Sequence, residues 1–149
     1  MDTCRVKLDA GVIGDLTPLT EANWRETGGY ADLELNVDWE TYRQLDEIGV
    51  FYAFVMYDGL TPIGYSFYIA APCHPHDKTK RFAVQDTFYV IPNQRAKGAG
   101  LSLLAFVEAY LMNEGFNVIT QAAKPGSGFN RVLERKGYEH TENMYLKRL

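Results

Sequence analysis

The sequence predicts a single domain of the α+β class, and three observations support this. The chain has 149 residues, of which 46% are hydrophobic and 23% charged, as is usual for one soluble domain with a core. Segments rich in aromatic and branched residues, typical of strands, follow one another through its middle. Segments in which apolar residues recur at helical spacing precede and follow these strands. Helices that flank an antiparallel run of strands favour the α+β class.

The first ninety residues are expected to form two helices and then three strands. Pro18 can begin a short helix that runs to Glu26. Asp38 is a suitable N-cap for a second helix, whose apolar residues recur every three positions until Gly49 ends it. The strands cover residues 51–57, 63–70 and 82–90. Asp58-Gly59 is a strong turn signal between the first two, so an antiparallel meander should result.

The second half alternates helices and strands. An apolar stripe predicts a helix over residues 100–113, with Gly115 just beyond its end. A short strand follows at 117–121. Ser127 can cap another helix, which Gly137 ends, and residues 138–146 are expected to make the last strand.

The loop between the third strand and its helix has the composition of an anion site. It carries Arg95, Lys97, Gly98 and Gly100 at the start of the helix, where unpaired backbone N–H groups and the helix dipole favour negative charge. Glycines let the backbone approach phosphate oxygens, and the two cations add charge-assisted hydrogen bonds. Phosphate is the expected ligand, although glycines can also serve only to tighten an ordinary strand-to-helix turn.

Two common phosphate motifs do not fit this loop. A dinucleotide fingerprint needs a third glycine where Leu103 stands, and in a P-loop the lysine follows a glycine and precedes Ser or Thr. The remaining pattern closely resembles the acyl-CoA pyrophosphate loop of the GNAT superfamily of N-acetyltransferases: Val90-x-Pro92-x-x-Arg95-x-x-Gly98-x-Gly100.

The resemblance covers nearly all of residues 1–149 as one domain and implies the GNAT fold. That fold has a mixed, largely antiparallel sheet of about six to seven strands with four helices. Its splayed strands, here 82–90 and 117–121, form the CoA cleft. The chain looks most like the small GNAT proteins encoded by tailed bacteriophages. The implied activity is acetyl transfer from acetyl-CoA to an amine by direct attack in a ternary complex, without a metal. The implied cofactor-binding residues are Phe88, Tyr89, Val90, Arg95, Ala96, Lys97, Gly98, Ala99, Gly100 and Asn130, the last shifted from the family's usual asparagine position.

Two residues are predicted to be catalytic. Asp86 stands four positions before Val90, where many acetyltransferases carry the acid that binds the ammonium and passes its proton to water. Strand alternation would place it on the face of Phe88 and Val90, although it could instead pair with Arg81 or with a loop lysine. Thioester aminolysis also needs an oxyanion donor, for which a backbone N–H of residues 88–90 is expected.

The family's general-acid tyrosine is absent, because Leu133 stands at its position. Tyr145 or Tyr89 could replace it, or could simply pack in the core or at the rim. A thiol with a pKa of about 8.5 can also leave as thiolate without an acid. A catalytically silent CoA-binding module that serves as a protein-interaction partner is therefore the alternative function.

Charge and composition limit the partners. Net charge is −4, which argues against nucleic acid. Residues 1–74 carry four basic and twelve acidic side chains, and residues 75–149 carry eleven and seven. The acidic half suits a cationic amine, or is simply a solvated surface. No apolar run is long enough for a membrane span.

The cysteine content of the chain favours a reducing compartment. Only Cys4 and Cys73 are present, so reduced thiols in the cytoplasm are expected, in the host cytoplasm if the protein is phage-encoded. Cys73, His74 and His76 lack zinc-site spacing and should form a surface or substrate-facing loop. A homodimer is left open.

Overall fold

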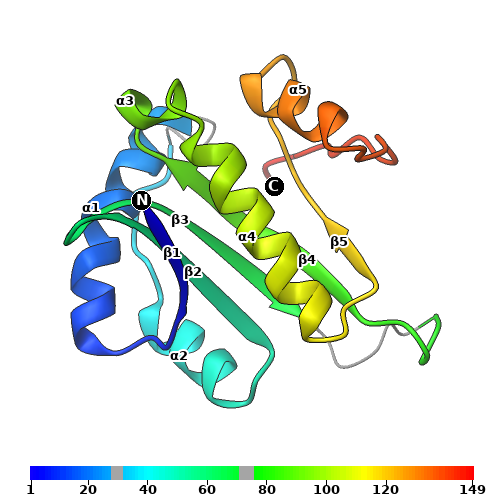
Figure 1. Ribbon diagram of the computed structural model, residues 1–149, viewed down its shortest axis with the longest axis horizontal. Coiled ribbons are helices and arrows are strands. Elements are labelled where there is room, and N and C mark those ends of the chain that lie inside the picture. The colour runs from blue at the N-terminus through cyan, green and yellow to red at the C-terminus, as the bar shows by residue number, and fades with distance from the viewer. Residues whose placement is uncertain (28–31, 71–75) are drawn as a thin grey trace.

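The computed structural model describes residues 1–27, 32–70 and 76–149 of the chain. In these ranges a five-stranded sheet, ordered β1-β2-β3-β4-β5, is covered by helices on both faces (Figure 1). The elements are β1 (Asp2–Val6), α1 (Ala10–Thr27), α2 (Trp39–Glu47), β2 (Phe51–Asp58), β3 (Thr61–Ala70), β4 (Phe82–Val90), α3 (Pro92–Arg95), α4 (Ala99–Asn113), β5 (Val118–Thr120) and α5 (Gly128–Arg135). No helix in these ranges is long and apolar enough to cross a membrane.

The sheet is mixed. Strands β1 to β4 pair antiparallel in chain order, and β5 joins β4 in parallel. The predicted turn between β2 and β3 is confirmed: Gly59 adopts a φ of 61°, in the left-handed region that glycine tolerates best. The α+β class and the predicted antiparallel meander are therefore correct.

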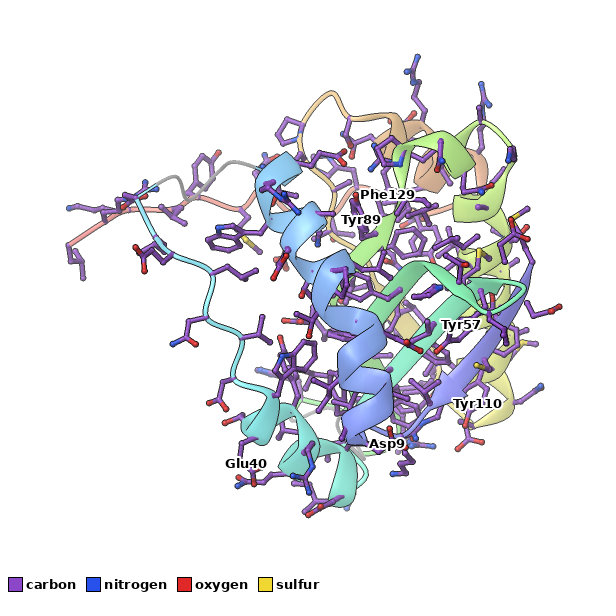
Figure 2. All side chains as sticks on the ribbon, turned by 90° about the vertical axis from the view of Figure 1, so that its left-hand side faces the viewer. Asp9, Glu40, Tyr57, Tyr89, Tyr110 and Phe129 are labelled. Carbon is purple, nitrogen blue, oxygen red and sulfur yellow. The ribbon has the colours of Figure 1, made fainter. Side chains whose placement is uncertain are left out.

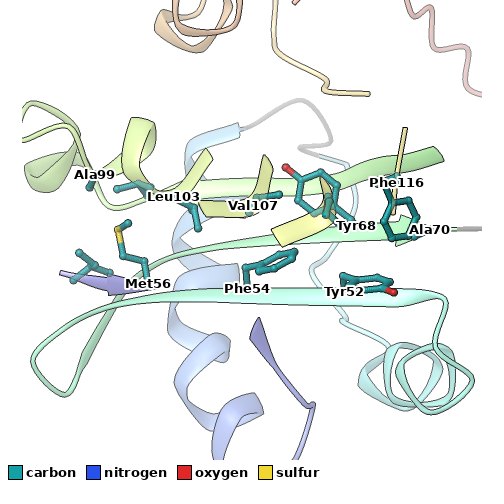
Figure 3. Packing of buried hydrophobic residues seen from close by; sticks show 13 residues of the cluster. Tyr52, Phe54, Met56, Tyr68, Ala70, Ala99, Leu103, Val107 and Phe116 are labelled. Atoms are coloured by element: carbon teal, nitrogen blue, oxygen red, sulfur yellow. The ribbon is translucent and has the colours of Figure 1, made fainter. Parts of the chain in front are cut away.

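Each face of the sheet has its own apolar core. One core packs α4 against β2, β3 and β4, through residues such as Leu103, Val107, Phe54 and Tyr68 (Figure 3). The other lies beneath α1 and α2 and is built around Phe51 and residues 65 and 67 of β3. The central strands are thus buried on both sides, which explains their nearly continuous aromatic and branched composition.

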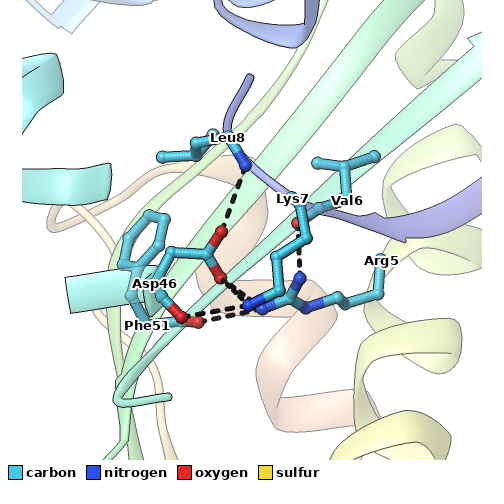
Figure 4. Close-up of polar contacts among 6 residues, drawn as sticks. All are labelled: Arg5, Val6, Lys7, Leu8, Asp46 and Phe51. Atoms are coloured by element: carbon cyan, nitrogen blue, oxygen red, sulfur yellow. Dashed lines mark hydrogen bonds and ion pairs between the residues drawn. The ribbon is translucent and has the colours of Figure 1, made fainter. Parts of the chain in front are cut away.

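A buried carboxylate fastens α2 to the first strand (Figure 4). Asp46, only 3% exposed, lies near the end of α2. It accepts hydrogen bonds from the Arg5 guanidinium, from Lys7 Nζ at 3.0 Å and from the backbone N–H of Leu8 at 3.1 Å. This cluster fixes α2 relative to the edge of the sheet.

The N-terminal part of the chain differs from the prediction. β1 was not expected, because its five residues are polar at most positions and take strand form by pairing with β2. The first helix begins at Ala10, not Pro18, and Asp9 caps it by accepting the Val12 N–H at 2.9 Å. The glycines and Pro18 within α1 weaken the helix signal in the sequence. Packing of buried Leu16 against the sheet core stabilises the helix instead.

The C-terminal end also differs. The strand expected at 138–146 is wrong, since residues 138–149 have no regular secondary structure. A strand needs a hydrogen-bonding neighbour, and β5 is only three residues long and pairs with β4. The described residues therefore contain five strands and five helices, where six to seven strands and four helices were expected.

Candidate active site

Strand β4 continues beyond its neighbour β5. The two strands pair at Phe82, Ala83 and Val84, after which β4 runs on to Val90 while the chain after β5 turns toward α5 (Figure 1). The outer edge of residues 85–90 is thus not paired with β5. The predicted divergence of these two strands is confirmed.

A β-bulge lies where β5 ends. On β3, Phe67 is opposite Thr87, but the next residue, Tyr68, is opposite Gln85, so Asp86 is the inserted residue of β4. Bulges redirect side chains and often occur beside active sites. Here the bulge reverses the alternation of faces along β4.

The reversal corrects one expectation about Asp86. Phe88 and Val90 belong to the core beneath α4. Asp86 instead reaches toward α2, where its Oδ2 accepts a hydrogen bond from Tyr42 Oη at 2.8 Å. Asp86 therefore does not share a face with Phe88 and Val90, because the extra residue shifts the period-two pattern by one.

The backbone of β4 beyond the bulge presents amides to the unpaired edge. Ile91 donates its N–H to Ile63 O at 2.9 Å, and pairs of residues in an antiparallel ladder alternate between bonded and non-bonded. With Gly64 opposite Val90 and Ser66 opposite Phe88, the N–H groups of Phe88 and Val90 point away from β3. That of Tyr89 points toward β3. Two of the three expected oxyanion donors thus face the wedge between β4 and β5.

Tyr42 is a site residue that the sequence did not single out. Its ring packs against Phe51 and Phe67, with centroids 4.9 and 5.5 Å apart, which aims the hydroxyl at Asp86. Burial, and then the Asp86 charge, raise the pKa of the Tyr42 phenol, so it remains a donor at any ordinary pH. The sequence predicted Tyr42 only as one of the apolar residues that recur along this helix.

A second polar group extends this site along the same face. Asn23 of α1 donates to Tyr65 Oη at 3.1 Å and to Thr87 Oγ1 at 3.0 Å. Thr87 is the neighbour of Asp86 in β4. Three elements, α1, β3 and β4, are thereby joined by side-chain hydrogen bonds beside the bulge.

A pocket of about 420 Å³ opens next to Asp86. Its lining comes from the segment before α2, from α2 itself, and from β3 and β4: Leu35, Asn36, Val37, Asp38, Thr41, Tyr42, Leu45, Ile69 and Asp86. The volume is within the range of small-molecule sites. Asp86 thus lies between a ligand-sized pocket and the unpaired edge of β4.

The glycine loop before α4 has the geometry of an anion site. Gly98 caps the helix with a φ of 81°, and no side chain caps it. A Cβ added at Gly98 or at Gly100 would meet no atom within 4 Å, so the space above both residues is open. Ala99, Gly100 and the next residue supply the N–H groups of the first turn, and the exposed Lys97 adds a cation.

Arg95 makes a different set of contacts from a free loop cation. Its two terminal nitrogens bond to the carboxylate oxygens of Glu26 at 2.7 and 2.6 Å, and its Nε donates to Val90 O at 2.8 Å. The guanidinium lies 5.5 Å from the centre of the Tyr89 ring. Arg95 therefore braces the loop between β4 and the C-terminal end of α1.

Comparisons with known proteins agree with this geometry. Residues 15–138 match the model of the acetyltransferase (GNAT) family. The chain belongs to the GNAT family of acetyltransferases. No curated protein matches it. The loop before α4 is the feature by which the sequence resembled this family.

Solved acetyltransferases have the same fold at low identity. An aminoglycoside acetyltransferase from an uncultured soil metagenomic sample, in complex with sisomicin, is 18% identical, with a TM-score of 0.76 and 99% and 96% of the two chains covered. A ribosomal-protein-alanine N-acetyltransferase from Brucella melitensis biovar Abortus 2308 is 15% identical, with a TM-score of 0.73 and full coverage of both chains. A predicted acetyltransferase with acetyl-CoA from Clostridium acetobutylicum is 16% identical, with a TM-score of 0.72 and coverages of 99% and 96%.

The GNAT helix after β5 lies close to β4. Phe129 of α5 stacks on Phe88, with ring centroids 4.6 Å apart, and Figure 2 shows Phe129 toward the opposite end of the molecule from Glu40 of α2. Asn130 donates to Lys124 O at 2.8 Å, which fixes the turn before α5. Ser127 occupies the predicted cap position but makes no capping hydrogen bond.

Packing buries neither proposed general acid in the wedge between β4 and β5. Tyr145 is 88% exposed in the C-terminal segment. Tyr89 is buried in the core beneath α1. Leu133, at the usual tyrosine position, is a buried residue of α5. The predicted acid role of Tyr145 therefore gains no support from packing.

Two alternatives for nearby residues can be compared with the structure. Arg81 does not pair with Asp86: it donates to Glu114 O and lies 4.0 Å from the centre of the Phe116 ring.

Cys73 and His74 fall outside the described residues, so the expected absence of a metal stays a prediction. In the described part of the chain, no three metal-ligating side chains are grouped together.

Proposed function

We propose that this GNAT protein transfers an acetyl group from acetyl-CoA to an amine by direct attack within a ternary complex. The observation that carries the proposal is the position of Asp86, between the pocket and the unpaired edge of β4. Family membership favours an enzyme over a silent CoA-binding module.

The loop before α4 is assigned to the CoA pyrophosphate. The open space above Gly98 and Gly100 allows close approach of phosphate oxygens to the first N–H groups of the helix. The exposed Lys97 supplies a positive charge for the phosphate oxygens, while Arg95 holds the loop in place through its ion pair with Glu26. Ala96 and Ala99 contribute their backbone. The acetyl-CoA-bound structure from Clostridium acetobutylicum, of the same fold, is consistent with this ligand.

The thioester is assigned to the wedge beside β4. The N–H groups of Phe88 and Val90 face this edge and are suited to stabilising the oxyanion that develops on the carbonyl. In the described chain the free thiol is Cys4, which lies on β1 at the far edge of the sheet. Direct attack is the proposed route because the amine itself is then the nucleophile at the thioester carbonyl.

Asp86 is assigned to the amine. Alkylamines are mostly protonated near pH 7, so a carboxylate is needed to bind the ammonium and to pass its proton to water before the neutral amine attacks. Tyr42 donates to Oδ2, and we assign Oδ1 to the amine. The CoA thiol departs as thiolate, which its pKa of about 8.5 permits without a tyrosine acid.

The test is release of CoA thiol from acetyl-CoA in the presence of an amine panel, with the acetylated product identified by mass spectrometry. Asp86→Asn should lower turnover by about 100-fold or more while CoA binding remains close to that of the parent. Asp2→Asn, the same change on the distant strand β1, is the matched control and should leave turnover unchanged. If Asp86→Asn turns over like the parent, the carboxylate is structural and the mechanism is wrong.

Three further expectations stay predictions under this proposal. Cytoplasmic location, in the host cytoplasm if the protein is phage-encoded, can be measured by cell fractionation. Homodimer formation can be measured by light scattering. The absence of nucleic-acid binding can be measured by a mobility-shift assay.

A further inference from the structure

The pocket beside Asp86 has the chemistry of a particular class of acceptor. We infer that it takes a small amine with a single ammonium group on a compact apolar body, such as an alkylamine or an arylalkylamine, rather than a polyamino sugar. This inference rests on the proposed function and specifies its acceptor.

The first observation is the apolar part of the lining. Leu35, Val37, Leu45 and Ile69 contribute aliphatic side chains to the pocket. Ile69, the second-last residue of β3, is 42% exposed. Exposed apolar surface that lines a concave site favours an apolar ligand, because the ligand removes this surface from water.

The apolar surface continues along the sheet. Ile69 is opposite Val84 in the β3–β4 ladder, and directly opposite residues of antiparallel strands lie on the same face. Val84 is 49% exposed. Asp86 follows two residues later, toward α2. A ligand whose amine meets Asp86 can therefore lay its apolar body over Ile69 and Val84.

The second observation is that Asp38 accepts hydrogen bonds from the protein at both carboxylate oxygens, whereas for Asp86 the structure shows one such bond, from Tyr42 to Oδ2. Asp38 caps α2: its Oδ1 accepts the Thr41 N–H at 2.9 Å and its Oδ2 accepts the Thr41 hydroxyl at 2.7 Å. These hydrogen bonds lower the pKa of Asp38 and hold its charge at the helix terminus. Asp86 is left as the carboxylate suited to an ammonium, which matches a ligand with one charge.

The third observation concerns the acidic first half of the chain. Half of its twelve carboxylates form ion pairs away from the pocket: Glu21 with Arg25, Glu26 with Arg95, Asp32 with Arg148, Asp46 with Arg5, and both Glu40 and Glu47 with Arg43. Within the described chain, Asp38 is the acid of this half that lines the pocket. Additional ammonium groups of a polyamino sugar would lie against aliphatic side chains, where desolvation of a charge is unfavourable.

The experiment measures kcat/KM for acetyl transfer to four probes: hexylamine, 2-phenylethylamine, spermidine and kanamycin. We expect the two apolar monoamines to exceed spermidine and kanamycin by about 10-fold or more, the worth of burying one or two methylene groups. A higher kcat/KM for kanamycin or spermidine would overturn the inference and leave the proposed function standing. Release of no CoA thiol with any amine would overturn the proposed function itself.

Variants of Ile69 test the apolar surface directly. Ile69→Glu places a second carboxylate beside the ligand body, so it should lower kcat/KM for hexylamine about 10-fold and raise the preference for 1,6-hexanediamine over hexylamine. Ile69→Gln should lower hexylamine turnover without a gain for the diamine. Leu60→Glu, at a 97% exposed turn position, is the matched control. An unchanged amine preference in both Ile69 variants, with CoA binding intact, would show that Ile69 does not contact the acceptor.

Discussion

Asp46→Asn gives the sharpest test of how the fold holds the site. Asp46 fastens α2, which carries Tyr42, to Arg5 and Lys7 of the N-terminal segment (Figure 4). The substitution keeps the shape of the side chain but leaves the Arg5 guanidinium, whose side chain is only 16% exposed, without its counter-charge. The expected result is a destabilised protein with a loosened α2.

The magnitude follows from the burial of each partner. Removing one partner of a buried ion pair costs about 3 to 5 kcal/mol. Arg5 also donates to Val6 O and Phe51 O, which favours the lower end of this range. The Lys7 side chain is 66% exposed, so its pair adds about 1 kcal/mol or less. A loss of about 3 kcal/mol should lower the melting temperature by roughly 6 to 12 °C in a chain of this size.

Urea unfolding and calorimetry measure this loss, and two variants make it specific. Glu47→Gln removes the adjacent carboxylate of α2, which is 69% exposed and paired with Arg43, and should change stability by about 0.5 kcal/mol or less. Arg5→Met combined with Asp46→Asn should be less destabilising than the sum of the single changes, because no unpaired charge remains buried. A loss below about 1 kcal/mol for Asp46→Asn would refute the reasoning.

Three more predictions concern the site. Gly100→Val should abolish the thermal stabilisation by CoA, which is roughly 5 to 10 °C at a CoA concentration 100 times the dissociation constant. The free variant should melt near the parent temperature, because its new side chain meets only open space, and a CoA shift that persists would show that the loop does not bind CoA. Tyr42→Phe should lower kcat/KM about 10-fold by removing one hydrogen bond to Asp86, and should add little to Asp86→Asn; full additivity in steady-state kinetics would contradict their coupling. The Arg95 guanidinium lowers the pKa of Glu26, so their pair should stabilise the fold above the ordinary carboxyl pKa of 4.5 and lose that effect as pH falls through the lowered pKa. Melting curves of Glu26→Gln and the parent should therefore differ at pH 7 and converge at acidic pH, and a constant difference would count against the pair.

The sequence by itself determined the elements whose signals are local. The bounds of β4, the turn at Asp58-Gly59 and the helix after Gly98 follow from residue composition and glycine geometry, and the structure confirms each one. The order of these elements, together with the loop of Arg95 to Gly100, was enough to indicate the GNAT family, which the family comparison confirms. The same local signals misplaced the start of α1 and produced a C-terminal strand that does not form.

Tertiary structure alone decided how the site is assembled. The bulge at Asp86 arises from the register between β3 and β4, a non-local pairing that no periodicity in β4 reveals, and it turns the carboxylate toward α2. Tyr42 reaches that carboxylate from 44 residues away because aromatic packing under α2 orients its ring. Arg95 was predicted to bind phosphate, but its partner Glu26 is 69 residues distant in the chain. Contacts of this kind depend on how the layers pack, which composition and spacing do not determine.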